Sequence, residues 1–308
     1  MPPLPETLKG RHFTRVADFS TDELEVVLDT AEQLKATPRQ DQQLLPGRGL
    51  GMIFQKPSTR TRVSFEVGMA QLGGHALYLR ADDLQLGRGE TVKDTATVLS
   101  RYLDAIMIRT FAQDDVDELA ANASIPVING LTDSAHPCQA LADVLTIRER
   151  LSRIEGVRVA YLGDGNNVCS SLMVAVARLG GSFVAATPPG YEPDQKALAI
   201  ARESGAQVDV TDDPEAAVRG AAVLYTDVWT SMGQDEEREQ RLRDLAGYGI
   251  TKELVAQAAD QAIVLHCLPA HYGEEITEEV LYGPQSAVWD QAENRLHAQK
   301  GLLALVVR

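Results

Sequence analysis

Short apolar runs alternate with stretches of helical periodicity along most of the chain. In the first half, four runs of this kind predict strands, at 50–54, 75–79, 105–109 and 125–129, with helices at about 90–102 and 114–122. A second series of apolar runs follows, at 157–163, 182–187, 222–228, 262–268 and 286–290. This alternation predicts an α/β protein with two doubly wound parallel-sheet domains, joined by a long helix from about His136 to Arg153.

Several helix boundaries can be assigned from residue chemistry. Ser20 and Glu23 form a capping box for a helix through about Lys35. Ser58 can cap a second helix, which the glycine pair at 73–74 ends. That second helix carries two apolar stripes, so we expect burial on most of its sides. The stripes are Val63, Val67 and Ala70, and Phe65, Met69 and Leu72.

The expected domain boundaries follow from the two series of strands. We expect a first domain at 1–150 and a second at 151–293, with the amphipathic stretch from Asn294 to the end of the chain packing back on the first domain.

Composition narrows the functional class. The chain of 308 residues has 44% hydrophobic and 24% charged residues, as is usual for a globular protein. No apolar run reaches the roughly 20 residues needed to cross a bilayer, and the N-terminal stretch lacks a secretion signal, so we expect a cytoplasmic protein without membrane partners. A net charge of -15 argues against nucleic acid as a partner. The three cysteines are widely spaced and predict neither a disulfide framework nor a zinc knot.

The stretch FQKPSTRTR at 54–62 concentrates cations and hydroxyls in this acidic chain. A strand ends here and Ser58, Thr59, Arg60 and Thr61 open a helix, where free backbone N–H groups and the helix dipole favour an anion. Guanidinium groups add paired hydrogen bonds to phosphate oxygens. The plainer interpretation is a well-capped helix whose arginines, Arg62 among them, meet solvent or acids.

Further polar residues follow other predicted strands, where α/β proteins place their chemistry. Arg109 ends one strand, and His136 and Gln139 open the long helix; together they predict donors for an oxygen that gains negative charge. Alone, His136 is more simply a capping or buried histidine.

The GDGNN stretch at 163–167 resembles a dinucleotide fingerprint but lacks its third glycine, and no acid ends the next strand. A nicotinamide cofactor, and with it a dehydrogenase, is therefore disfavoured. The asparagines suit a small zwitterion better, and simple turn chemistry is the plainer alternative.

Two strand ends in the second domain carry DVWTSMG at 227–233 and HCLPA at 266–270. Asp227 could bind an amino group, Ser231 and the following backbone a carboxylate, and Cys267 a reacting amine. The plainer interpretation of Cys267 is an inert buried thiol.

Taken together and in this order, these motifs resemble the aspartate/ornithine carbamoyltransferase family over nearly the whole chain. The matching segments are STRTR (58–62), Gln85 with KDTA (93–96), IRT (108–110), HPCQALAD (136–143), GDGNN, DVWTSMGQ, HCLPAHYGEEIT (266–277) and DQAENRLHAQK (290–300). The resemblance implies an N-terminal carbamoyl phosphate domain, a C-terminal amine domain, and assembly as trimers or multiples of trimers. It implies no metal and no organic cofactor.

The resemblance also implies roles for individual residues. The phosphate would be held by Ser58, Thr59, Arg60, Thr61 and Arg109, with Gln85 supplied by a neighbouring subunit. Arg109, His136, Thr61 and Arg295 would surround the carbonyl oxygen, and Gln139, Cys267 and Leu268 the carbamoyl amide. The α-amino and α-carboxylate groups of the amine substrate would be held by Asn167, Asp227, Ser231 and Met232.

These last residues match the ornithine-using branch of the family. The implied reaction is carbamoyl transfer from carbamoyl phosphate to the side-chain amine of L-ornithine, giving L-citrulline and phosphate. Branches that use putrescine or acylated ornithine share much of this pattern and remain alternatives. A catalytically silent binding relative is a further alternative, although STRTR, HPCQ and HCLP are all intact.

Overall fold

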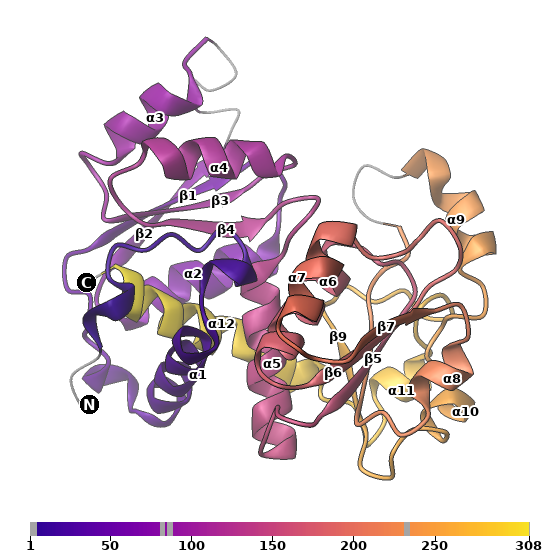
Figure 1. The fold of residues 1–308 in the computed structure, drawn as a ribbon. Helices are drawn as coiled ribbons and strands as arrows, with labels where there is room; N and C mark the ends of the chain where they lie inside the picture. Colours follow the sequence, from indigo (N-terminus) through magenta and orange to yellow (C-terminus); the bar gives the residue numbers. More distant parts are fainter. Residues whose placement is uncertain (1–4, 81–83, 85–88, 231–234, 308) are drawn as a thin grey trace. The chain divides into compact units, whose positions relative to one another are not determined.

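The computed structural model describes residues 5–80, 84, 89–230 and 235–307 (Figure 1). The chain divides into two compact units, which are described separately below. The first unit comprises Met1–Ala142 and Asn294–Arg308, and the second comprises Asp143–Glu293. The division falls inside helix α5 (Pro137–Leu151) and inside helix α12 (Val288–Val306).

The first unit is built on a four-stranded parallel sheet in the order β2-β1-β3-β4. All four strands were predicted, and they are β1 (Gly49–Phe54), β2 (His75–Arg80), β3 (Ala105–Arg109) and β4 (Val127–Leu131). β4 begins two residues later than predicted because Pro126 has no N–H to give to the ladder.

Helices cover both faces of this sheet. Figure 1 shows α3 (Val92–Leu99) and α4 (Gln113–Asn122) on one face, and α2 (Thr59–Gln71) on the other, with α1 (Thr21–Ala36) and α12 on that side as well. The first face is sealed by a buried cluster that includes Ile53, Ile106, Val116 and Leu119. The predicted capping box is present, since the Glu23 N–H donates to the Ser20 side chain at 3.3 Å.

Helix α2 differs from expectation in one respect. Phe65 and Met69 are buried, as predicted, but Val63 is 50% exposed and Val67 39% exposed. The expectation that both stripes are buried is therefore wrong for this chain, because the stripe with Val63, Val67 and Ala70 faces outward rather than toward the sheet.

The second unit contains a five-stranded parallel sheet in the order β7-β6-β5-β8-β9. Its strands are β5 (Arg158–Leu162), β6 (Ser182–Ala186), β7 (Val208–Thr211), β8 (Val223–Thr226) and β9 (Ile263–His266). Its helices are α6 (Asn167–Arg178), α7 (Gln195–Glu203), α8 (Pro214–Val218), α9 (Arg238–Asp244), α10 (Lys252–Val255) and α11 (Glu278–Leu281). Short 3-10 helices occur at Glu6–Leu8, Val16–Asp18, Arg39–Asp41 and Asp235–Glu237.

The sequence-based prediction of this sheet missed one strand and placed another wrongly. β7 was not predicted, because its run VDVT is only four residues long. The strand predicted at 286–290 is wrong: Ser286 makes a single bridge to Val264, and the chain then enters α12 at Val288. A short apolar run does not distinguish a strand from the first turn of a buried helix.

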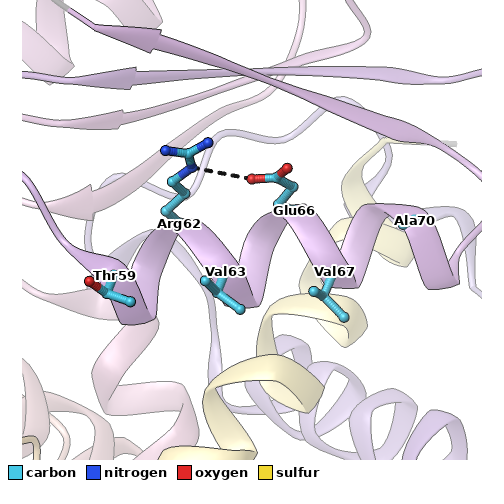
Figure 2. Close-up of a pocket in the computed structure, with 6 residues that line it drawn as sticks. All are labelled: Thr59, Arg62, Val63, Glu66, Val67 and Ala70. Atoms are coloured by element: carbon cyan, nitrogen blue, oxygen red, sulfur yellow. Dashed lines mark hydrogen bonds and ion pairs between the residues drawn. The ribbon is translucent and has the colours of Figure 1, made fainter.

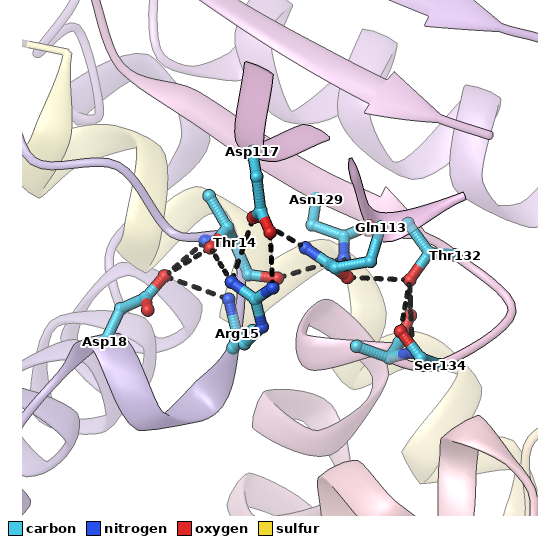
Figure 3. Close-up of polar contacts among 9 residues, drawn as sticks. Thr14, Arg15, Asp18, Gln113, Asp117, Asn129, Thr132 and Ser134 are labelled. Carbon is cyan, nitrogen blue, oxygen red and sulfur yellow. Dashed lines mark hydrogen bonds and ion pairs between the residues drawn. The ribbon is translucent and has the colours of Figure 1, made fainter. Parts of the chain in front are cut away.

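A polar network fixes the chain before α5 in the first unit. Figure 3 shows Gln113 of α4 accepting hydrogen bonds from Thr132 at 2.8 Å and from Asn129 at 3.2 Å. Thr132 in turn accepts from the Ala135 N–H at 3.1 Å. Arg15 joins the network through Asp117, whose Oδ1 accepts a hydrogen bond from Arg15 Nη1 at 2.9 Å. These hydrogen bonds hold the turn that leads into His136.

The described part of the chain contains no helix that is both long enough and apolar enough to cross a membrane.

Candidate active site

The first cluster of candidate residues lies where the strand order of the first sheet reverses, between β1 and β3. The carboxyl ends of neighbouring parallel strands form a crevice at such a point. Phe54 pairs with Arg109 in the ladder, and the Gln55 N–H donates to the Arg109 carbonyl at 2.9 Å. The loop from β1 to α2 therefore starts beside Arg109.

Ser58 caps α2, as predicted. Its hydroxyl accepts from the Thr61 N–H at 3.2 Å and lies 3.2 Å from the Thr61 hydroxyl. The first turn of α2 contains no acidic residue, so its positive end is not neutralised from within the helix. This arrangement is suited to an anion at the start of α2.

Arg295 of α12 connects α2 with α5 inside the first unit. Its Nη1 donates to Gln139 Oε1 at 2.7 Å, and its Nη2 donates to Thr61 Oγ1 at 3.2 Å. All three side chains are buried, with exposures of 4% for Arg295, 1% for Gln139 and 1% for Thr61. The guanidinium fork thus fixes two of the predicted site residues relative to each other.

His136 lies within this cluster, directly before α5, and is buried. Burial, together with the nearby guanidinium groups of Arg295, Arg109 and Arg60, lowers the pKa of His136 well below its usual range. The imidazole is therefore neutral at physiological pH. A neutral ring can donate one hydrogen bond without adding a further charge to three guanidinium groups.

The other cations of the FQKPSTRTR stretch have partners of their own. Lys56 is ion-paired with Asp133 and lies 4.2 Å from the centre of the Phe111 ring. Arg62 pairs with Glu66 at 3.3 Å and covers the Tyr78 ring at 4.1 Å. Arg60 is the exposed cation that opens α2 and acts electrostatically on His136. The plainer interpretation thus holds for Arg62. Arg60 stays the candidate anion ligand because it is exposed in the first turn of α2.

Beside this cluster, the outward side of α2 lines a surface pocket of about 580 Å³. Figure 2 shows its lining residues along one helix, with the Arg62–Glu66 ion pair on one side and the exposed valines on the other. The lining consists of Thr59, Arg62, Val63, Glu66, Val67 and Ala70. The pocket begins at Thr59, which was predicted to hold phosphate.

In the second unit, the strand order reverses between β5 and β8, and a second polar cluster lies at their ends. Asp227 follows β8 and is buried. Its Oδ2 accepts from Asn166 Nδ2 at 2.8 Å, and its Oδ1 accepts from the Val228 N–H at 2.8 Å and from Cys267 Sγ at 2.7 Å. The predicted pairing of the DVWTSMG and HCLPA segments therefore brings Asp227 and Cys267 into contact.

Asn166 caps α6, accepting from the Val168 N–H at 2.9 Å and the Cys169 N–H at 3.1 Å. Asn167, the residue singled out from the sequence, is the next residue and the first of α6. The structure thus assigns the contact with Asp227 to Asn166. Asn167 was predicted to help hold the α-amino and α-carboxylate groups of the amine substrate, and the contact of Asn166 with Asp227 was not predicted.

The second glycine of the GDGNN loop, Gly165, has a packing role. A side chain on Gly165 would lie 2.4 Å from the backbone nitrogen of Pro193. The Gly165 N–H already donates to the Tyr191 carbonyl at 2.8 Å. The close approach of the 191–193 segment thus explains a glycine at position 165.

Two positioning contacts in the second unit were not predicted. Arg241 of α9 is ion-paired with Asp164 and donates to the Trp229 carbonyl at 2.6 Å. Burial raises the pKa of Asp164 to about 6, and the Arg241 guanidinium opposes that rise. Because Asp164 and Trp229 flank the polar cluster, Arg241 anchors both of its loops. No spacing rule links residues so distant in sequence.

The second contact fixes the backbone after β9. His266 Nδ1 accepts from the Leu268 N–H at 2.8 Å, so the proton of a neutral ring is on Nε2, which lies 3.1 Å from Glu275 Oε1. Leu268 has a positive φ of 60° and precedes a cis bond to Pro269. The His266–Glu275 pair therefore stabilises the conformation of the predicted residues Cys267 and Leu268.

Three predicted residues, Gln85, Ser231 and Met232, lie outside the described residues. Among the others, Thr61, Arg109, His136, Gln139 and Arg295 lie together in the first unit with Ser58, Thr59 and Arg60 at the start of α2. Asn167, Asp227, Cys267 and Leu268 lie in the second unit, where Asp227 and Cys267 are in contact.

Two models of one protein family match successive parts of the chain. The family model described as aspartate/ornithine carbamoyltransferase, carbamoyl-P binding domain, matches residues 11–149, and the Asp/Orn binding domain model matches residues 155–306. The chain belongs to the aspartate/ornithine carbamoyltransferase family.

Relatives within the family share most of the sequence. The chain is 55% identical to an ornithine carbamoyltransferase of Pyrococcus horikoshii, covering 98% of this chain and 97% of the relative. It is 56% identical to an ornithine carbamoyltransferase of Symbiobacterium thermophilum, covering 98% and 99%. A solved ornithine carbamoyltransferase structure from Pyrococcus furiosus has a TM-score of 0.93 and 55% identity, covering 97% of this chain and 98% of the other.

Proposed function

We propose that this protein transfers the carbamoyl group of carbamoyl phosphate to the side-chain amine of L-ornithine, producing L-citrulline and phosphate. The observation that carries the proposal is the buried, neutral His136 among Arg60, Arg109 and Arg295 beside the α2 N-terminus. Such a cluster is suited to a dianionic phosphate joined to a polar carbonyl. The family and the names of its relatives support the same reaction.

The first domain, at 1–150 with the returning segment 294–308, is the proposed carbamoyl phosphate-binding domain. Phosphate is held by the first turn of α2 and by two guanidinium groups, through Ser58, Thr59, Arg60, Thr61 and Arg109. Helix N–H groups offer fixed donors, and arginine offers paired ones. The acid-free first turn of α2 supports this assignment.

The carbonyl oxygen gains negative charge when the amine attacks. Arg109, His136 and Arg295 are the proposed donors to that oxygen, and Gln139, Cys267 and Leu268 are the proposed ligands of the carbamoyl amide. Donors already fixed in a dry site need little reorganisation as charge develops. The hydrogen bonds from Arg295 to Gln139 and Thr61 support such preorganisation.

The second domain, at 151–293, is the proposed ornithine-binding domain. Asp227 pairs with the α-ammonium group, Ser231 and Met232 receive the α-carboxylate, and Asn167 assists. The existing hydrogen bonds of Asp227 to Asn166 and Cys267 fix its carboxyl group for this task. The ornithine side-chain amine then faces Cys267.

The reaction balances without a redox step. The neutral amine attacks the carbonyl carbon, a C–N bond forms, the C–O bond to phosphate breaks, and phosphate carries away the surplus proton. An aliphatic ammonium group has a pKa of about 10 in water, so the protein must favour its neutral form. Nearby guanidinium groups and desolvation both act in that direction.

A homotrimer, or a multiple of trimers, is the proposed assembly, with Gln85 reaching the site of a neighbouring subunit. The outward face of α2 supports an interface near the phosphate residues, because exposed valines line the pocket that begins at Thr59 (Figure 2). A cytoplasmic location is proposed as well, as expected from the sequence.

Carbamoyl transfer to four amines in parallel, measured as amine-dependent phosphate release, tests the proposal: ornithine, putrescine, N-acetylornithine and aspartate. We expect ornithine to exceed each other amine by at least about 10³-fold in kcat/KM, because a site built for two polar anchors rejects a substrate that lacks one. Equal use of putrescine would show that the α-carboxylate is not recognised. No turnover of any amine would favour a binding relative.

A further inference from the structure

A turn of the second unit brings together one histidine and two glutamates, one of which also contacts His266. His271, Glu274 and Glu275 each offer a candidate ligand atom within 4.8 Å of the other two. The turn follows the Leu268–Pro269 bond, and neither the phosphate cluster nor the contact of Asp227 with Asn166 involves these residues.

Each glutamate uses one carboxylate oxygen for a structural contact. Glu275 Oε1 accepts from the His271 N–H at 2.6 Å and lies 3.1 Å from His266 Nε2. Glu274 Oε1 is ion-paired with Arg238 of α9. These interactions fix both carboxylates and leave the second oxygen of each directed elsewhere.

The second oxygens converge on His271. Glu275 Oε2 lies 3.7 Å from His271 Nδ1, and Glu274 Oε2 lies 4.0 Å from it. All three atoms are buried, and within the described part of the chain none of them has a hydrogen-bond partner. The Glu275 side chain is fully buried. Three buried polar atoms without hydrogen bonds around one point are unusual, because each carries an uncompensated desolvation cost.

A protonated His271 shared by the two carboxylates is the simpler explanation, but it satisfies the geometry less well. Both distances exceed the 2.7–3.2 Å range of a normal N–H···O hydrogen bond. Nδ1 carries a single proton and can serve one oxygen at a time. One buried carboxylate oxygen would still lack a donor.

A metal ion satisfies all three atoms at once. Zinc binds imidazole nitrogen and carboxylate oxygen at about 2.0–2.2 Å, which places tetrahedral ligands about 3.4 Å apart. The two separations from His271 Nδ1, 3.7 and 4.0 Å, need to shorten by about 0.3 and 0.6 Å, and the three candidate ligand atoms all lie within 4.8 Å of one another. Calcium and magnesium prefer sites made entirely of oxygen, so the imidazole favours a first-row transition metal.

We propose that His271, Glu274 and Glu275 bind a divalent transition-metal ion of the zinc class, with water completing its coordination. The site lies outside the residues proposed for carbamoyl transfer and does not depend on that function. Glu274 is ion-paired with Arg238 of α9, and Glu275 contacts His266, which accepts from the Leu268 N–H. The ion therefore links the turn to α9 and to the backbone of Leu268. Its expected role is to rigidify this part of the second unit.

A titration with Co²⁺ and Zn²⁺ tests the proposal on the full chain carrying Cys267→Ser. That background is needed because Asp227, His266 and Cys267 form a second possible metal group, which belongs to the candidate active site. Visible absorption of bound Co²⁺ reports nitrogen and oxygen ligands, and zinc stoichiometry is measured after dialysis. We expect one ion per chain and a higher melting temperature with zinc.

Three variants separate the alternatives. His271→Gln and Glu274→Gln change side chains that are 41% and 21% exposed, so the fold is expected to survive, as circular dichroism would verify. Each should weaken binding by about 100-fold, since even loss of a residue that only supports a ligand costs about 10- to 100-fold. The matched control Glu278→Gln changes a nearby exposed acid and should leave affinity unchanged. Absence of binding, or equal affinity in all three variants, would overturn the proposal.

Discussion

Replacing Arg295 with lysine retains a positive charge but removes the planar fork that joins Gln139 to Thr61. In the parent protein the two arms of the guanidinium donate at 2.7 and 3.2 Å to these two side chains. The lysine ammonium is a single point on a flexible stem and cannot reproduce both directions. At least one of the two buried acceptors therefore loses its charged donor.

The magnitude follows from the strength of the hydrogen bond that the substitution removes. One hydrogen bond to a charged group contributes about 1.5–3 kcal/mol, and about 1.4 kcal/mol corresponds to tenfold in rate. If the fork acts mainly on the transition state, Arg295→Lys lowers kcat/KM for carbamoyl phosphate by about 10- to 150-fold. A smaller loss of stability accompanies it, because Gln139 and Thr61 are both buried.

Steady-state citrulline formation, with carbamoyl phosphate varied at saturating ornithine, measures this effect. Urea unfolding of the same samples separates lost chemistry from lost stability. Arg48→Lys is the matched control, because Arg48 also pairs with a side chain, Asp104 at 2.6 Å, but lies outside the cluster. Equal kcat/KM in the two variants would refute the role assigned to the fork.

Three other substitutions test separate parts of the account. Arg60→Ala removes an exposed cation at the start of α2, so we expect activity to fall by about 10³-fold or more at an unchanged melting temperature; near-normal turnover would exclude Arg60 as a phosphate ligand. Asp227→Asn should lower kcat/KM for ornithine by about 10²- to 10³-fold, the effect of breaking a buried ion pair, while calorimetry shows unchanged affinity for carbamoyl phosphate; equal losses of both would point to misfolding instead. Lys300→Met should raise the free energy of unfolding at pH 7 by about 1–3 kcal/mol, because burial lowers the pKa of Lys300 to about 8. Between pH 8 and 10.5 the unfolded parent chain binds more protons than the folded one, so the stability of the parent rises with pH in that window and the variant should lack this rise; equal pH profiles in urea unfolding would contradict it.

Most of the fold was predictable because its signals are local. Strands β1, β3 and β5 are continuous apolar runs, as expected for parallel strands covered on both faces. Capping chemistry correctly placed the starts of α1 and α2. The error at 286–290 has the opposite cause: the run that starts at Ser286 makes one bridge and then continues as a helix, and only tertiary context decides between these.

The candidate site was predictable in composition more than in geometry. The sequence indicated Arg109 at the end of a predicted strand and His136 and Gln139 at the start of a predicted helix. The hydrogen bond from Arg295 to Gln139, however, joins residues 156 positions apart. The ion pair of Arg241 with Asp164 has the same character. Pairings of this kind depend on the register of whole elements, which no local pattern specifies. The exposed face of α2 could not be predicted either, since an apolar stripe looks the same whether it packs inside one chain or against another.

The most direct test of the central claim follows the new bond itself. Carbamoyl phosphate labelled with ¹³C at the carbonyl is incubated with the protein and with ornithine labelled with ¹⁵N at the side-chain amine, and the products are observed by NMR. We expect citrulline with a one-bond ¹³C–¹⁵N coupling and one phosphate released for each citrulline formed. Carbonyl carbon attached to the unlabelled α-nitrogen, or phosphate release without a coupled product, would contradict it.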